Sequence, residues 1–362
     1  MKDFSITSAR VDWGRMPVKL RFSYGTIDAF DFQIVRLRAG DAEGIGEIVV
    51  PRHPFLDEVL AGLIGADARG LDALLPAVTD GLERLVCEAV SIALHDLLGR
   101  ISGLPLYVLL GGAAQTRVPL MPCIFPEDAG EAGQQARSWF ERGHRFLKTK
   151  LIGDLAEDQA RVEAIRAVAP DGATLQGDAN EGYTTLDEAL EAVERTGRAG
   201  LDVFEDPLKG DADAYAALRR RRSDDAARIM IDALARRTTD LADALRVGAA
   251  DVVGIHPDQP GSLSRALRHV RLAQAFGVPV VVGGTGYTGI GTAAYQHLTA
   301  VATPGGPCGE LGGAFDHGMP RSMARRPLPM ADGFVTLPDA PGMGIELDEQ
   351  VLGEFATGRA DW

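Results

Sequence analysis

Hydrophobic and polar residues alternate with a period of two along the first fifty residues. Three such runs, VKLRFSYGT, FDFQIVRLRAG and GIGEIVV, are separated by turn signals, so each predicts a β-strand with one buried face. The spacing then becomes helical, and residues 82–99 carry apolar side chains at intervals of three and four before Gly103 and Pro105. An antiparallel sheet followed by helices predicts a separate α+β domain at residues 1–115.

From residue 117 onward, short apolar runs alternate with charged amphipathic segments. Continuous apolar strands separated by helices are typical of a parallel sheet that is buried on both faces. Eight such units predict a (β/α) barrel over residues 116–327 rather than an open sheet. Turn residues return after that, and we expect residues 328–362 to cross back and complete the first domain. The eight runs are VPLMPC, FLKTKL, TLQGDA, LDVFED, RIMIDA, ADVVGIH, VPVVVGG and CGEL.

Composition narrows the class of protein. The 362 residues carry a formal net charge of −14, which argues against nucleic acid as a partner, since that needs a concentrated excess of Lys and Arg. No apolar run reaches the roughly 18 residues of a membrane span, and the first residues lack the apolar segment of a signal peptide. The three cysteines form no CxxC pair, which fits a reducing compartment. We therefore expect a cytoplasmic protein without a membrane or nucleic-acid partner.

Ionisable residues stand at the ends of most predicted barrel strands. A (β/α) barrel gathers its catalytic residues at the carboxyl ends of its strands, and a purely structural barrel has no reason to place charged groups there. These side chains are therefore the candidates for chemistry. In chain order they are Lys148, Lys150, Asp178, Glu205, Asp232, His256 and Glu310.

Three of these candidates are carboxylates on consecutive strands. Asp178, Glu205 and Asp232 follow one another at intervals of one βα unit and should project towards one point, where they repel unless a cation neutralises them. All-oxygen ligation with room for substrate suits Mg²⁺, with Mn²⁺ as an alternative. A helix-capping role is the competing interpretation for any one of them, but three in register favour a metal site.

The two lysines flank a threonine on a single strand. Because side chains alternate along a strand, Lys148 and Lys150 point to the same face and Thr149 to the other. Each ammonium group makes the other easier to deprotonate, as does burial, and a lysine then becomes a usable base near neutral pH. Solvated surface lysines are the alternative, which the apolar strand disfavours.

Several segments along the chain form a specific pattern through their order and spacing. They are GIGE at residues 44–47, IALHDLLGRISGLPLYVLLGG up to Gly112, LKTKL, GDAN, FEDP, GVPVVVGG and PDAPGMGIELDE. Together they resemble the enolase superfamily, in its mandelate racemase and muconate-lactonizing branch, and the resemblance covers nearly the whole chain. It implies a modified (β/α)7β barrel closed by an α+β capping domain, and commonly a homo-oligomer.

The resemblance also implies roles for individual residues. Lys150 would abstract the proton α to a substrate carboxylate while Mg²⁺ stabilises the ene-diolate, and Lys148 would add positive charge beside that carboxylate. Asn180 matches the Asn of the family's DxN element and could donate a hydrogen bond. Glu310 matches an acidic residue after the eighth strand, where it could meet substrate or a catalytic partner.

One position departs from the family pattern. In the muconate-lactonizing and dipeptide-epimerase groups the sixth strand ends in a second lysine, whereas this chain has His256 there. An imidazole titrates near neutrality, so His256 could serve the second face of the substrate. Protonation there gives racemisation or epimerisation of a small carboxylic acid or amino-acid derivative, which we prefer. Loss of a β-hydroxyl gives an acid-sugar or hydroxy-acid dehydratase, and a purely substrate-binding His256 is a third alternative.

The first domain and the seventh barrel unit carry further candidates for binding. We expect the substrate to be recognised from the first domain, with Tyr24 and Arg52 as candidates. The sequence Gly284-Thr285-Gly286-Tyr287-Thr288-Gly289 is formally GxGxxG, a dinucleotide fingerprint, but it lies in the seventh unit rather than the first. A barrel kept only as a binding protein is disfavoured by the intact lysines and carboxylates.

Overall fold

The computed structural model describes residues 3–22, 25–78, 81–113, 115–284, 288–309 and 321–362. Its first part is a four-stranded antiparallel sheet in the order β15-β1-β2-β3, with α2 packed against β2 and β3. We call this sheet and its helices the cap. A buried core of aliphatic side chains lies between them. The cap comprises β1 (Ser8–Phe22), β2 (Gly25–Ala39), β3 (Ala42–Ile48), β15 (Ala356–Asp361), α1 (Pro54–Leu63), η1 (Ala68–Leu74), α2 (Gly81–Ser102) and α3 (Leu106–Leu109).

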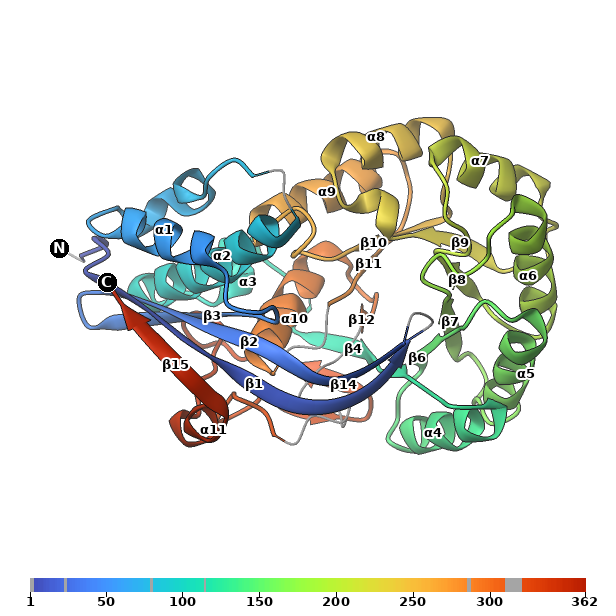
Figure 1. The fold of residues 1–362 in the computed structure, drawn as a ribbon, viewed down its shortest axis with the longest axis horizontal. Coiled ribbons are helices and arrows are strands. Elements are labelled where there is room, and N and C mark those ends of the chain that lie inside the picture. The colour runs from blue at the N-terminus through green and yellow to red at the C-terminus, as the bar shows by residue number, and fades with distance from the viewer. Residues whose placement is uncertain (1–2, 23–24, 79–80, 114, 285–287, 310–320) are drawn as a thin grey trace.

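The predicted eight strands form a closed parallel barrel (Figure 1). The first barrel strand closes the barrel and consists of two parts, β4 and β5, separated by a break at Pro122. β4 pairs with β12, and β5 pairs with β6. The Pro122 carbonyl accepts the N–H of Lys148 at 2.9 Å, which carries the ladder across the break. The strands are β4 (Arg117–Met121), β5 (Cys123–Ile124), β6 (Phe146–Lys150), β7 (Thr174–Asp178), β8 (Val203–Glu205), β9 (Arg228–Ile231), β10 (Val252–Ile255), β11 (Val280–Val282) and β12 (Cys308–Gly309).

Helices follow the strands and cover the outside of the barrel (Figure 1). Most begin where a short polar side chain accepts a backbone N–H of the first turn: Asp154 precedes α5, and Thr185 forms a capping box before α6. The helices are α4 (Ala129–Glu141), α5 (Leu155–Arg166), α6 (Leu186–Arg198), α7 (Ala212–Arg221), α8 (Thr238–Val247), α9 (Leu263–Ala275) and α10 (Ile290–Ala302), with the short η2 (Ala233–Ala235) before α8.

The last segment of the chain serves both parts. A hairpin of β13 (Met330–Ala331) and β14 (Phe334–Thr336) pairs with β4 of the barrel, whereas α11 (Glu349–Phe355) leads into β15 of the cap sheet. The prediction of a capping domain on a (β/α)7β barrel is confirmed in architecture. The division at residues 115/116 and 327/328 stays a prediction. Within the described residues, no helix is long and apolar enough to cross a membrane.

A buried carboxylate joins the cap to the final segment. Asp96 of α2 accepts the backbone N–H of Ile45 at 3.0 Å and of Met343 at 2.8 Å, and the Arg100 guanidinium donates to it at 2.8 Å. A buried carboxylate is costly unless its oxygens are bonded, and here three donors surround it. This one side chain therefore fixes three segments that are distant in sequence.

Candidate active site

Both predicted lysines lie in the carboxyl-terminal half of β6, and their side chains are almost completely buried. The Lys148 ammonium Nζ lies 3.0 Å from Asp178 Oδ2 and 2.7 Å from Glu205 Oε2. Lys150 Nζ forms a hydrogen-bonded ion pair with the same Asp178 oxygen. The structure thus brings the lysine pair and two of the three predicted carboxylates together inside the barrel.

The strand register explains why these groups meet. Lys150 pairs with Asp178, and Asp178 pairs with Glu205, across three adjacent parallel strands. Burial alone would raise the pKa of Asp178, but the ammonium groups of Lys148 and Lys150 outweigh it and hold that pKa well below its usual range. Glu205 also accepts a hydrogen bond from Gln176 Nε2 at 2.5 Å. Asp178 is therefore held as an anion, and Glu205 is held as a hydrogen-bond acceptor between Gln176 and Lys148.

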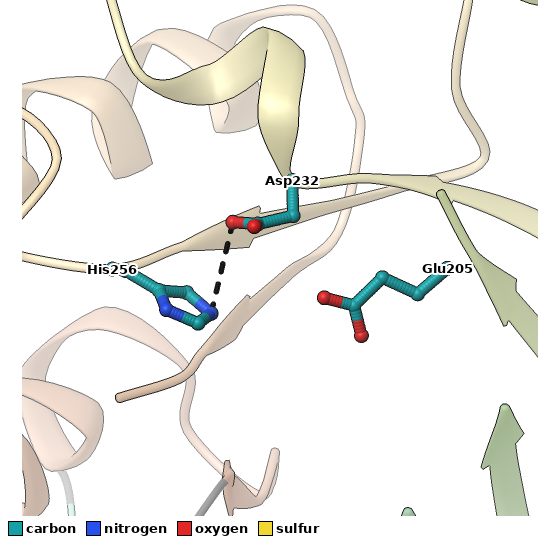
Figure 2. Close-up of side chains that lie close together, drawn as sticks. All are labelled: Glu205, Asp232 and His256. Carbon is teal, nitrogen blue, oxygen red and sulfur yellow. Dashed lines mark ion pairs between the residues drawn. The ribbon is translucent and has the colours of Figure 1, made fainter. Parts of the chain in front are cut away.

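Asp232 and His256 complete the arrangement from the next two strands. Figure 2 shows the carboxylate of Asp232 facing the imidazole of His256, with Glu205 pointing towards both. His256 Nε2 lies 3.7 Å from Asp232 Oδ1, and Gln259 Nε2 donates to that oxygen at 2.7 Å. One ligand atom from each of Glu205, Asp232 and His256 lies within 4.8 Å of the others. This spacing allows a single metal ion to be held.

The donor set fits a hard divalent cation. Asp178, Glu205 and Asp232 supply carboxylate oxygens from three neighbouring strands. Oxygen atoms of this kind are the ligands that Mg²⁺ prefers. The Asp178 carboxylate contacts the two lysines and lies outside the close group formed by Glu205, Asp232 and His256. The Lys148 ammonium lies between Asp178 and Glu205. Its positive charge reduces the repulsion between these two carboxylates, as a bound cation would. The three predicted ligands therefore fit the metal, and His256 stands close enough to contribute.

Asp206 belongs to the site although its position at a strand end does not predict a role, and its place in the FEDP segment is the signal that could have identified it. Its carboxylate accepts the backbone N–H of Asp232 at 3.0 Å and of Ala233 at 2.9 Å. Burial, and then the neighbouring Asp232 and Glu205 carboxylates, raise the pKa of Asp206 well above its usual range. Its φ of 40° is left-handed, which a non-glycine residue seldom adopts. Asp206 thus fixes the backbone that carries Asp232.

The neighbour of His256 on the next strand has to be a glycine. A Cβ added to Gly283 would lie 2.3 Å from His256 Nε2 and 2.9 Å from Cδ2, far inside ordinary contact. The imidazole therefore occupies the volume that a side chain at position 283 would need. His256 itself is only 9% exposed, so the ring has little room to move elsewhere.

The remaining predicted residues fall into three situations. Asn180 lies at the site, and its N–H and side-chain amide donate to Asp178 at 2.9 and 3.2 Å. Arg52 pairs with Asp57 and stacks 4.6 Å over the Trp13 ring, so its guanidinium is engaged within the cap. Tyr24 and Glu310 lie outside the described residues. The proposed roles of all four stay predictions.

The start of α10 bears on the dinucleotide alternative. In that alternative the phosphate sits at a helix N-terminus. Here the buried carboxylate of Glu47, from β3 of the cap, accepts the N–H groups of Thr288, Ile290 and Gly291 at 2.6, 3.1 and 2.9 Å. A carboxyl group of the chain itself therefore takes the position that a pyrophosphate would need.

Comparison with known proteins agrees with this geometry. Residues 131–351 match the family model of the enolase C-terminal domain-like proteins. Muconate cycloisomerase 1 of Rhodococcus opacus is 30% identical to the chain, covering 96% of it and 97% of that protein. Cis-3-hydroxy-L-proline dehydratase of Roseibium aggregatum is 28% identical over 98% of both chains.

A third relative adds a solved structure. N-succinyl-L-Arg/Lys racemase of Bacillus cereus is 24% identical over 94% of this chain and 95% of that one. Its crystal structure superposes with a TM-score of 0.89 at 22% identity, covering 99% of this chain and all of that one, which shows the shared fold. The chain is therefore an enzyme, an isomerase or a carbon–oxygen lyase, that acts through proton abstraction next to a carboxylate. It belongs to the enolase superfamily, in the branch of mandelate racemase and muconate-lactonizing enzymes.

Proposed function

We propose that this enzyme racemises or epimerises a small carboxylic acid or amino-acid derivative, with Lys150 and His256 working on opposite faces. The observation that carries this proposal is their placement in the barrel. Between β6 and β10 lie β7, β8 and β9 on one side and β4, β12 and β11 on the other. Lys150 ends β6 and His256 follows β10, so the two groups face each other across the barrel axis.

Magnesium, with manganese as a substitute, is the metal that we assign to Asp178, Glu205 and Asp232. When bound, it supplies the positive charge that stabilises a substrate ene-diolate, since an α-proton beside a carboxylate is too weakly acidic for an amine alone. The ligands are held in place by their partners: Gln176 at Glu205 and Gln259 at Asp232. Lys148 keeps further positive charge at the carboxylate end of the substrate.

The proton transfers then divide between the two faces. Neutral Lys150 Nζ accepts the α-proton from one face, and its Asp178 partner stabilises the ammonium that results. Protonated His256 donates a proton to the same carbon from the other face, which inverts the centre. The reverse reaction uses the same two atoms in the opposite roles. Asp232 Oδ1 lies 3.7 Å from His256 Nε2, so its carboxylate lies beside the imidazole throughout the exchange of protons.

Dehydration is the second candidate, and the dehydratase relative favours it. In that reaction Lys150 would remove the α-proton, and His256 would protonate a departing β-hydroxyl instead of the α-carbon. Both reactions need the same two groups, so the substrate decides between them. The homo-oligomeric state and the cytoplasmic location also stay predictions from the sequence.

Proton exchange in D₂O tests the role of Lys150. We expect the purified enzyme with Mg²⁺ to incorporate deuterium at the α-carbon of at least one acid from a library of amino-acid derivatives and acid sugars. Proton NMR reports exchange, inversion and elimination in one spectrum. Lys150→Ala should reduce exchange by roughly 10²–10⁴-fold, and a chelator should abolish it. Lys209→Ala, which removes an exposed lysine outside the site, should leave it unchanged. Wild-type exchange in Lys150→Ala would overturn the assignment.

A further inference from the structure

A second cavity lies between the cap and the rim of the barrel, apart from the lysines and carboxylates of the active site. Its volume is about 580 Å³, within the range of small-molecule sites. The segment that leads into α2 forms one wall, and the starts of α8 and α9 form the other. The lining residues are Ala77, Val78, Arg84, Arg236, Arg237, Thr238, Thr239, Pro260, Arg265, Arg268 and His269.

The walls of this cavity carry a concentration of positive charge. Five of its lining residues are arginines, and none of the described lining residues is Asp or Glu, although the chain as a whole has a net charge of −14. Two of these arginines have a carboxylate at long range: Asp240 lies 3.8 Å from Arg237, and Asp72 lies 3.8 Å from Arg268. Like charges gathered in one cavity repel one another, so an anion bound among the arginines would reduce that repulsion.

One of the arginines, Arg237, also stands at an unfavourable end of a helix, directly after Arg236. Arg237 is the N-cap of α8 and offers no side-chain acceptor to its first turn, unlike Asp154 before α5 or Ser262 before α9. A helix N-terminus carries partial positive charge and is stabilised by anions. Cations at this position therefore add to the positive potential instead of reducing it.

Hydroxyl and imidazole groups complete the lining. His269 is buried, and its Nε2 lies 2.7 Å from Thr238 Oγ1, which fixes the first residue of α8 at the cavity wall. Arg265 donates to the carbonyls of Pro260 and Pro76 at 3.5 and 3.3 Å, so its guanidinium is held in place. Within the described residues, Arg236 and Arg265 form no ion pair with a carboxylate.

We propose that this cavity binds a small, multiply charged phosphate compound. Guanidinium groups donate pairs of hydrogen bonds to phosphate oxygens, and several of them with a helix N-terminus suit the many acceptors of a phosphate ester or pyrophosphate. The described lining holds no Phe, Tyr or Trp side chain on which a nucleobase could stack, so the phosphate itself provides the recognition. Bound there, it contacts the cap segment and the barrel together and stabilises their junction.

Titration calorimetry with sodium pyrophosphate, without divalent metal and at low salt, tests the proposal. The double variant Arg236→Gln with Arg237→Gln removes two exposed side chains and should weaken binding at least tenfold. The matched control Arg220→Gln with Arg246→Gln removes the same charge from exposed helix positions elsewhere and should bind within twofold of wild type. Pyrophosphate should also raise the melting temperature of the wild type but not that of the cavity variant.

Three outcomes would overturn the proposal. The first is no saturable binding of pyrophosphate by the wild type, and the second is equal weakening in the control variant. Tighter binding of citrate than of pyrophosphate would contradict the assignment to phosphate. Lys150→Ala should bind pyrophosphate as the wild type does, because the cavity does not include the active-site lysines. Failure of α-proton exchange would leave this result untouched, so the two proposals can fail separately.

Discussion

The contact between Gly283 and His256 allows a perturbation that acts on only one half of the proposed reaction. In Gly283→Ala the new Cβ would lie 2.3 Å from His256 Nε2, whereas ordinary contact begins at 3.4 Å. The imidazole therefore has to shift by about 1 Å, and a displacement of that size can cost on the order of 10²-fold in rate. Lys150 lies on the opposite strand and keeps its position. We expect inversion to fall about 10²-fold, while exchange by Lys150 on one enantiomer persists.

The assay follows each enantiomer of a confirmed substrate separately by NMR in D₂O. The enantiomer whose α-proton faces Lys150 should still exchange, and the one facing His256 should not. A double-mutant comparison checks the cause: in a His256→Asn background, Gly283→Ala should add little further loss, because the group that it displaces is gone. Equal loss of exchange from both enantiomers would refute the reasoning, as would full additivity of the two substitutions.

Two further predictions concern stability. Asp96→Ala removes the acceptor of the donors around that carboxylate, Arg100 among them. We expect the free energy of unfolding to fall by about 3–5 kcal/mol, measured by urea denaturation. The control Asp171→Ala, at an exposed position, should change it by less than about 0.5 kcal/mol. Burial lowers the pKa of His297 to about 4, so the unfolded chain takes up a proton first as the pH falls. Stability should therefore be fully present above about pH 6.5 and decline towards pH 4 by about 3 kcal/mol, and His297→Gln should flatten this part of the pH profile. An unchanged profile in that variant would contradict the buried neutral imidazole.

The barrel and most of the candidate site could be predicted because both depend on local pattern. Each apolar run became a strand, and the rule that functional residues end barrel strands located the lysines, the three carboxylates and His256. Strand register then brings Lys150, Asp178 and Glu205 side by side. These positions follow from chain order alone, since neighbouring units of a parallel barrel are neighbours in sequence.

Contacts between distant segments could not be predicted in this way. Nothing near Glu47 in the sequence indicates that it binds the start of α10, and the bonds from Asp206 to the backbone at Asp232 depend on how two strand ends pack. The contacts of Arg52 with Trp13 and Asp57 are of the same kind, since no local pattern indicates them. Pairings of this kind are set by tertiary packing, for which one sequence carries no periodic signal.

The last strand of the cap sheet to be synthesised is β15, which completes the sheet at the edge of β1. β15 pairs with β1, and Arg10 bonds Asp361 across a separation of 351 residues, so the first and last strands of the cap lie side by side (Figure 1). Contacts of such high sequence separation form slowly, because a long loop must close first. During synthesis the edge of β1 that pairs with β15 therefore stays unpaired until the whole barrel has been translated. An unpaired edge invites pairing with another chain, so the nascent enzyme is most vulnerable to aggregation in this interval.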